Sequence, residues 1–246
     1  MPQIVFNPPK ARDNRASWLY GFGLVWVGIS EAILFLLDAT FRGVNRRISD
    51  RHVKRFWKRL LKISHTQLEV FHADRLNPKR SYVYMSNHQS ILDIPVGLGS
   101  VPQSVRMVAK EGLFKIPFFG AAMAGTGFIP IDRRNITKAK GQLNQAQTRL
   151  QEGISVWIFP EGTRSRSLEL LPLKKGGFHV ALALGVPIVP VWIEGAAKAL
   201  PSDTLKVLPN QTIRVYFGHP IETAHLTRED LAVLMKQVRE AIEKMR

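Results

Sequence analysis

Apolar residues follow one another almost without interruption from residue 18 to residue 37. A helix over these 20 residues would just cross the hydrocarbon core of a bilayer, at a rise of about 1.5 Å per residue. Trp18 and Tyr20 at its start are typical of a membrane interface. Its one charged residue, Glu31, opposes a simple span, because a carboxylate at the bilayer centre costs about 3 kcal/mol. The pattern predicts a helix that either crosses a membrane or lies partly embedded in one leaflet.

Residues 42–62 have a different pattern, in which apolar residues recur at helical spacing between basic ones. Val53, Phe56, Trp57, Leu60 and Leu61 form the apolar face, which predicts a basic amphipathic helix on an anionic lipid surface. A solvated surface helix and a nucleic-acid-binding arm fit the same pattern, but the preceding apolar segment favours the membrane. We expect these cations on the cytoplasmic side. They are Arg42, Arg46, Arg47, Arg51, Lys54, Arg55, Lys58, Arg59 and Lys62.

Beyond residue 65, short apolar runs alternate with amphipathic stretches. The runs predict strands at residues 67–73, 81–86, 104–109, 154–159, 186–193 and 212–217. The amphipathic stretches at residues 135–151 and 227–244 predict helices. This alternation is typical of an α/β fold with a mostly parallel or mixed sheet flanked by helices. Two prolines in the run 186–193 predict a strand that bends or lies where backbone donors are not needed.

The change of pattern divides the chain near residue 65. Residues 1–64 would comprise a loose polar tail, over residues 1–17, and a membrane-associated pair of helices that docks the protein on lipid. Residues 65–246 would form the α/β domain. The total length of 246 residues suits one such domain with an appendage.

Composition narrows the chemistry further. The chain has no cysteine, which excludes a disulfide framework, a thiolate metal site and a cysteine nucleophile. The net charge of +16 indicates a polyanionic partner: nucleic acid, an anionic membrane surface or a phosphorylated substrate. No cluster of metal-ligating residues is visible in the sequence, so we expect no metal.

A histidine and an aspartate, His88 and Asp93, follow the predicted strand 81–86. If His88 lies in the turn and Asp93 in the first turn of a helix, the carboxylate can reach back to the imidazole. Such a bond fixes the tautomer and leaves the other ring nitrogen free to take a proton. An ordinary strand-to-helix loop with Asn87 and His88 as capping residues fits the same spacing.

A second polar cluster, residues 159–165, follows the predicted strand 154–159. Because ligands of open α/β sheets bind beyond the carboxyl ends of strands, we expect this cluster at the same edge as His88. Glu161 offers an acceptor and Arg164 a cationic donor, on either side of Gly162 and Thr163. A salt-bridged turn is the alternative interpretation.

A third candidate, Arg133, comes just after the apolar run 127–131. A guanidinium group matches phosphate oxygens in bidentate fashion, so Arg133 could bind a phosphate. Surface arginines are common in so basic a chain, and that interpretation stays open as well.

Taken in order, these stretches resemble the motifs of the glycerolipid acyltransferase family, which includes the 1-acylglycerol-3-phosphate (lysophosphatidic acid) acyltransferases. The resemblance covers residues 65–220 approximately. The matching stretches are NHQSILD at residues 87–93, GFIPIDR at 127–133, FPEGTRS at 159–165 and VPIVPV at 186–191.

The resemblance implies acyl transfer from a thioester of coenzyme A or acyl carrier protein to a glycerolipid hydroxyl, without a further cofactor. It makes His88 the general base and Asp93 the residue that orients and polarises it. It places Arg133, as well as Glu161, Gly162, Thr163 and Arg164, at the glycerol phosphate of the acceptor, with Lys110 as a lesser candidate.

The acceptor that this interpretation favours is lysophosphatidic acid, and the product is phosphatidic acid. A different lysolipid acceptor is the alternative within the same chemistry. A basic membrane-binding protein without catalysis would explain the charge but not the His88 and Asp93 pair. We therefore expect a membrane protein on the cytoplasmic face of the cell inner membrane or another membrane, with no nucleic-acid partner.

Overall fold

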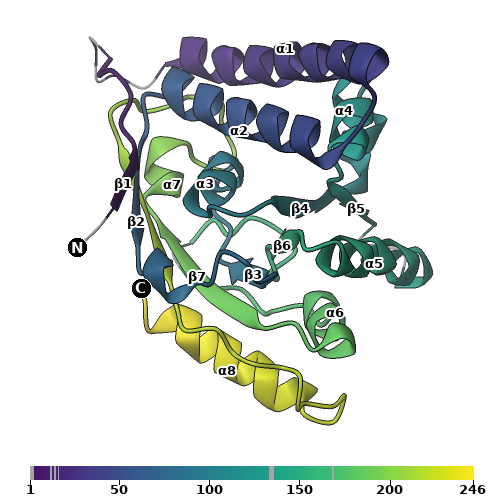
Figure 1. The fold of residues 1–246 in the computed structure, drawn as a ribbon. Coiled ribbons are helices and arrows are strands. Elements are labelled where there is room, and N and C mark those ends of the chain that lie inside the picture. The colour runs from purple at the N-terminus through teal and green to yellow at the C-terminus, as the bar shows by residue number, and fades with distance from the viewer. Residues whose placement is uncertain (1–2, 12, 14, 16, 133–135, 168) are drawn as a thin grey trace.

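In the computed structural model, the described residues are 3–11, 13, 15, 17–132, 136–167 and 169–246. They form an eight-stranded sheet in the order β1-β2-β8-β7-β3-β6-β4-β5 (Figure 1). The strands are β1 Gln3–Phe6, β2 Gln67–Phe71, β3 Val83–Ser86, β4 Val105–Lys110, β5 Ile129–Ile131, β6 Ser155–Ile158, β7 Ile188–Glu194 and β8 Thr212–Phe217.

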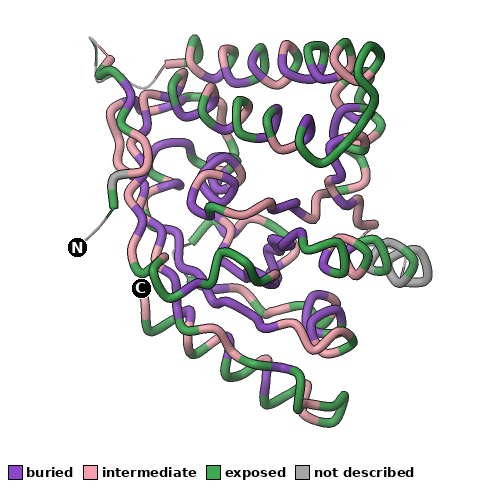
Figure 2. Tube along the Cα trace, in the orientation of Figure 1, coloured by how far each residue is buried: buried purple, intermediate pink, exposed green. Residues whose placement is uncertain are grey.

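The sheet is mixed, which confirms the predicted fold class. Strands β7, β3, β6, β4 and β5 run parallel to one another, while β8 runs antiparallel to β7 and parallel to β2. Each strand at the centre, β3, β6 and β7, is buried almost along its whole length (Figure 2). Consecutive buried apolar residues are typical of parallel strands that helices cover on both faces.

Strand β7 lies between β3 and β8, at the centre of the sheet. Its two prolines were expected to bend the strand or to lie where backbone donors are not needed. Pro190 still pairs with Met85 of β3, and its carbonyl accepts from the Gly218 N–H at 2.9 Å. The antiparallel ladder with β8 begins only one residue later, at Val191, so Pro190 stands at the end of that ladder.

Helices cover both faces of the sheet (Figure 1). One hydrophobic cluster joins residues of α1, α2, α3 and α7 to one face, and a second joins α5, α6 and α8 to the other. The helices are α1 Trp18–Arg42, α2 Arg46–Ile63, α3 Asp93–Ser100, α4 Phe119–Gly125, α5 Ile136–Gln151, α6 Gly176–Leu184, α7 Ala196–Ala199 and α8 Leu231–Glu243.

The N-terminal segment differs from the loose tail that its composition predicted. Residues Gln3–Phe6 form β1, which pairs antiparallel with β2 at the edge of the sheet. The ring of Phe6 meets that of Trp57 edge to face, with centroids 5.9 Å apart. Backbone pairing with an open strand edge, together with this aromatic contact, orders this short segment near the N-terminus.

Helices α1 and α2 pack side by side and on the α/β domain (Figure 1). Trp57 and Leu61 of α2 belong to the same hydrophobic cluster as Leu68 of β2. The residue pattern changes near residue 65, but the two sides share one hydrophobic cluster and pack on each other without a gap. As a domain boundary, residue 65 stays a prediction.

Helix α1 is long and apolar enough to cross a membrane, and only a third of its most apolar window is buried in the protein. Leu19 is 79% exposed and Trp26 67%. Together with other large apolar side chains they form what we call the outer face of α1. It comprises Trp18, Leu19, Phe22, Val25, Trp26, Ile29, Ile33, Leu34, Leu37 and Phe41.

Candidate active site

The polar stretches that the sequence singled out meet at the carboxyl edge of the parallel strands. Met85 of β3 pairs with Ile158 of β6, so the residues that follow each strand leave the sheet at the same level. On the other side of β6, Trp157 pairs with Met107, and β4 continues to Lys110. The register therefore brings the loops after β3 and β6 to one edge, as predicted, and the end of β4 to the same edge.

His88 lies in the loop after β3, and α3 begins at Asp93, as the sequence predicted. The two side chains lie 2.8 Å apart, between Nδ1 and Oδ2. Because a carboxylate accepts, Nδ1 carries the proton and Nε2 holds the lone pair. Nε2 has no hydrogen-bond partner among the described residues, and the His88 side chain is 12% exposed. The imidazole is thus oriented and has one nitrogen available to accept a proton.

Asp93 also shapes the loop that it faces. The same oxygen, Oδ2, accepts hydrogen bonds from the backbone N–H groups of Gln89 and Ser90, at 2.7 and 2.8 Å. The side chain is fully buried. A carboxylate that caps these amides at the start of α3 is stabilised by them and by the helix dipole. The carboxylate that orients the imidazole is therefore itself fixed.

Glu161 holds His88 from the neighbouring loop. Its Oε1 accepts from the His88 backbone N–H at 2.7 Å, and its Oε2 accepts from the Leu171 N–H at 2.8 Å. On the other side, the Ser165 N–H donates to the His88 carbonyl at 2.7 Å. The loop after β6 therefore binds both the backbone N–H and the backbone carbonyl of His88.

This position differs from the one expected for a ligand of the acceptor phosphate. Glu161 is only 2% exposed, and both carboxylate oxygens are engaged with backbone amides. Burial raises the pKa of Glu161 above its usual value, while those two amides lower it. A carboxylate also repels a phosphate, so the structure favours loop positioning for Glu161. Its contact with an acceptor stays a prediction.

Phe159 is a site residue to which the sequence reasoning gave no role. Its ring stacks on the His88 imidazole, with centroids 3.9 Å apart and planes inclined by 16°. The imidazole is therefore held at its edge by Asp93 and on its face by Phe159. The signal in the sequence was the position of Phe159 directly after a buried strand. A residue at that position lies beside the residues that follow the neighbouring strand of the sheet, which here is β3.

Asn87 was expected at most to cap a turn, but it bridges two strands. Its Oδ1 accepts from the Ile193 N–H at 2.7 Å, and its Nδ2 donates to the Ile193 carbonyl at 2.9 Å. The side chain thus continues the pairing of β3 with β7 beyond the last strand residue. Ser90 ties the same loop to Leu200 through its hydroxyl, at 2.7 Å.

The remaining candidates of the loop after β6 are Gly162, Thr163 and Arg164, which follow Glu161 in the chain. Gly162 adopts φ +74°, a left-handed conformation that glycine takes without strain. Thr163 is exposed and Arg164 half-buried. The Arg164 guanidinium has no ion-pair partner among the described residues, so its donors are free for an anion.

Lys110 is exposed at the end of β4, where it pairs with Ile131 of β5. It lies at the same edge, and neither a hydrogen bond nor an ion pair joins it to His88. The other candidate from this part of the chain, Arg133, lies outside the described residues. No group of three or more metal-ligating side chains occurs within the described ranges, and the predicted absence of a metal stays a prediction.

Comparison with known sequences identifies the family to which the chain belongs. The sequence model of the acyltransferase family matches residues 67–194, which include the loops that carry His88 and Glu161. This chain belongs to the acyltransferase family.

Individual members of the acyltransferase family match over different lengths. The 1-acyl-sn-glycerol-3-phosphate acyltransferase of Escherichia coli is 36% identical over 162 residues, which cover 65% of each chain. A chloroplastic relative from Brassica napus is 40% identical over 139 residues, 56% of this acyltransferase but only 40% of the relative. The human alpha enzyme is 34% identical over 98% of this chain and 84% of its own.

A solved structure has the same fold. The crystal structure of the 1-acyl-sn-glycerophosphate (LPA) acyltransferase from Thermotoga maritima matches with a TM-score of 0.76 and 24% sequence identity. The match covers 93% of this acyltransferase and 94% of that chain. At this identity the comparison supports the fold.

Proposed function

We propose that this chain is a 1-acylglycerol-3-phosphate O-acyltransferase, which moves a fatty acyl group from a thioester to the free hydroxyl of lysophosphatidic acid and so produces phosphatidic acid. The observation that carries the proposal is the bond from His88 Nδ1 to Asp93 Oδ2, which leaves Nε2 available beside a cationic loop. The names of the E. coli and human relatives support the choice of acceptor.

In this reaction His88 Nε2 takes the proton of the acceptor hydroxyl as its oxygen attacks the thioester carbonyl carbon. The C–O bond forms, the tetrahedral intermediate collapses, and the C–S bond breaks with its electron pair on sulfur. The leaving thiolate then takes the proton from the imidazolium. Asp93 stabilises the imidazolium that exists between these steps. No acyl-enzyme intermediate is needed, and neither is a cofactor.

The acceptor phosphate would lie at the loop after β6. Arg164 supplies bidentate donors, and the hydroxyl of the exposed Thr163 supplies a further one. The N–H of Gly162 donates to the Phe159 carbonyl at 3.0 Å, so Gly162 would contribute by its close approach to the phosphate. Lys110 adds charge from the neighbouring strand end, and we keep Arg133 as a candidate from the sequence. The acyl donor would be the thioester of coenzyme A or of acyl carrier protein.

The acceptor and the product are membrane lipids, so the enzyme must work at a bilayer. We propose that the outer face of α1 enters the lipid and that the basic face of α2 meets anionic headgroups, on the cytoplasmic side of the inner membrane or another membrane. The basic charge then serves a membrane and not a nucleic acid.

A panel of acceptors and donors tests the proposal. Protein reconstituted in vesicles is given lysophosphatidic acid, lysophosphatidylcholine or lysophosphatidylethanolamine, each with acyl-coenzyme A or acyl carrier protein, and products are identified by lipid mass spectrometry. We expect phosphatidic acid to form fastest. A faster reaction of a zwitterionic lysolipid, or no acyl transfer to any acceptor, would contradict the proposal.

Arg164→Ala sharpens the same panel. Loss of a charge-assisted hydrogen bond of about 1.5–3 kcal/mol should raise the KM for lysophosphatidic acid by about 10–100-fold, with a smaller change for the two zwitterionic acceptors. The matched control is Arg166→Ala, an exposed arginine of the same loop, which should leave KM unchanged.

A further inference from the structure

The segment that follows β6 closes on itself before α6 begins. The N–H of Lys174 donates to the Pro160 carbonyl at 2.7 Å, so the two ends of this segment are joined. Inside it, the Leu171 N–H donates to Oε2 of Glu161 at 2.8 Å. Loops whose ends lie close together are compact and frequently functional. We call residues 160–174 the closed loop.

The closure brings the side chain of Lys174 against Gly162. A Cβ atom on Gly162 would lie 3.5 Å from Cγ of Lys174 and 3.9 Å from its Cε. Because the ammonium follows Cε directly, the positive charge of Lys174 lies close to Gly162. Glu161, which precedes Gly162, binds the His88 N–H. A cation that is distant in sequence therefore lies beside the residues that hold the base.

The closed loop and the start of α6 carry an excess of positive charge. Residues 160–175 have four cations and two carboxylates, and no ion pair joins them among the described residues. They are Arg164, Arg166, Lys174, Lys175, Glu161 and Glu169. Both oxygens of Glu161 are already bound by backbone amides. Lys174 is exposed, so its ammonium is open to an anion beside Gly162.

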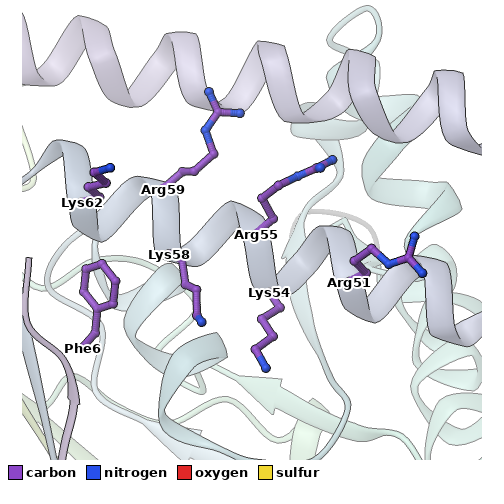
Figure 3. Close-up of a pocket in the computed structure, with 7 residues that line it drawn as sticks. All are labelled: Phe6, Arg51, Lys54, Arg55, Lys58, Arg59 and Lys62. Carbon is purple, nitrogen blue, oxygen red and sulfur yellow. The ribbon is translucent and has the colours of Figure 1, made fainter.

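The cations of α2 belong to a different surface. They line a groove to which Phe6 contributes and to which no residue of the closed loop contributes (Figure 3). Two of them, Arg55 and Arg59, extend toward α1 and bind the Glu31 carboxylate at 2.8 and 2.6 Å. The positive charge beside His88 therefore comes from the loops at the carboxyl edge of the sheet.

We propose that Lys174 binds the acceptor phosphate together with Arg164, and that this second cation selects a phosphomonoester over a phosphodiester. The inference rests on the proposed function, because it concerns the phosphate of the same acceptor. A phosphomonoester carries about 1.5 to 2 negative charges at neutral pH, whereas a phosphodiester carries a single one. The guanidinium of Arg164 matches one charge, and the ammonium of Lys174 matches the rest.

The position of Lys174 favours the acceptor over the acyl donor. In lysophosphatidic acid the phosphate is only a few bonds from the hydroxyl that reacts. In coenzyme A and in acyl carrier protein, the long pantetheine arm separates the nearest phosphate from the thioester. A cation beside Gly162, next to the Glu161 that holds His88, suits the nearer phosphate.

The test compares two acceptors in detergent micelles, with acyl-coenzyme A as the donor. Lysophosphatidic acid is a phosphomonoester, and lysophosphatidylglycerol is a phosphodiester with a single charge. Lys174→Met keeps an unbranched stem against Gly162 and removes the ammonium. Its KM for lysophosphatidic acid should rise about 10-fold, with kcat unchanged. The KM for lysophosphatidylglycerol, or its inhibition constant where it reacts too slowly, should rise less than about twofold.

Two further variants complete the comparison. Lys174→Arg keeps the charge and should restore most of the lost affinity for lysophosphatidic acid. Lys175→Met removes the adjacent exposed lysine, which stands at the N-cap of α6 without a side-chain capping bond, and should behave as the wild type does.

Three outcomes would overturn the proposal. An equal rise of KM for both lysolipids, or a fall of kcat without a rise of KM, would mean that Lys174 supports the loop and does not select the head group. A higher KM for acyl-coenzyme A with an unchanged KM for lysophosphatidic acid would place the cation at a donor phosphate. An effect of Lys175→Met as large as that of Lys174→Met would show that only the overall charge matters.

Binding without turnover separates this inference from the proposed function. In a His88→Ala background, isothermal titration calorimetry measures the binding of lysophosphatidic acid in micelles, with and without Lys174→Met. Weaker binding in the Lys174 variant, beside a wild type that transfers no acyl group, refutes the proposed reaction alone. Normal acyl transfer by the wild type, together with equal binding by both His88→Ala proteins, refutes the role of Lys174 alone.

Discussion

Buried carboxylates organise two regions of this molecule, and they use different partners. Around His88, Asp93 and Glu161 accept hydrogen bonds from backbone N–H groups and fix a loop. Between α1 and α2, Glu31 accepts from the guanidinium groups of Arg55 and Arg59, and fixes one helix on another.

The difference follows from what each region must do. Backbone amides have fewer degrees of freedom than long side chains, so a carboxylate that binds them holds the imidazole in the orientation that proton transfer requires. Arginine side chains are long and flexible, and those of Arg55 and Arg59 are 42% and 35% exposed. They hold the helices together while leaving the surface adaptable. Changes at His88, Asp93 and Glu161 should therefore affect catalysis, and changes at Glu31 should affect the helix pair.

The largest effect is expected from His88→Ala. Loss of a general base typically lowers kcat by about 10²–10⁴-fold, and nothing in α1 or α2 should change. Steady-state acyl transfer and vesicle partitioning, measured on the same preparation, check both halves of this statement. His179→Ala, an exposed histidine of α6, is the control and should be as active as the wild type.

Glu161→Gln comes next. A glutamine oxygen can accept from one of the two amides but cannot replace both carboxylate oxygens, so His88 loses part of its support. We expect kcat to fall by about 10–100-fold, from about 1.5–3 kcal/mol for a charged hydrogen bond, with KM for both substrates nearly unchanged. Glu169→Gln, at an exposed glutamate of the same loop, should have no effect. A rise in KM without a fall in kcat would mean that Glu161 binds the acceptor.

The pKa of Glu161 adds a pH dependence of stability. Because burial raises this pKa in the folded state, the folded chain holds the proton more tightly than the unfolded chain. The wild type should therefore gain stability relative to Glu161→Gln as the pH falls from the raised value toward about 4.3, the ordinary value for glutamate. Denaturant unfolding of both proteins at several pH values measures this difference. A loss of relative stability over that range would contradict the assignment.

In the helix pair, Glu31→Gln should weaken the link between α1 and α2. Because its arginine partners are partly exposed, the free energy of unfolding should fall by only about 1–2 kcal/mol. Micellar kcat should stay within about twofold of the wild type. Glu240→Gln breaks an exposed pair on α8, 3.9 Å from Lys236, and should cost less than about 0.5 kcal/mol. A Glu31→Gln protein that is fully stable but catalytically impaired would contradict the assignment of Glu31 to the link between α1 and α2.

The smallest effect is expected from Phe159→Leu. An aromatic stack is worth about 0.5–1.5 kcal/mol beyond its buried area, so its loss should lower kcat by about 2–10-fold without raising KM. Phe159→Tyr keeps the ring face and should restore kcat. If leucine and tyrosine give the same rate, the ring only fills space.

Sequence reasoning found the His88 and Asp93 pair because the contact is local. The two residues are five positions apart, and a strand that turns into a helix brings the carboxylate back to the imidazole. The helices and strands with strong periodicity were also predictable, including the basic helix α2 and the strands at the sheet centre.

The role of Glu161 could not be predicted in the same way. Its bond to the His88 amide joins residues 73 positions apart and exists because β6 lies beside β3. Strand order is a tertiary result, and hydrophobic patterns specify strands without specifying their neighbours. The stack of Phe159 on His88 depends on the same adjacency. Strand β1 was missed because it is only four residues long and lies in a polar, proline-containing segment, and its order comes from pairing with β2.

A double-mutant cycle of His88→Ala and Asp93→Asn tests the central claim most directly, by kcat in micelles with lysophosphatidic acid as the acceptor. If Asp93 acts through the imidazole, the double variant should be no slower than His88→Ala alone, although Asp93→Asn by itself lowers kcat. Costs of the two single changes that add in the double variant would show independent action and contradict the account of His88 as a base that Asp93 orients.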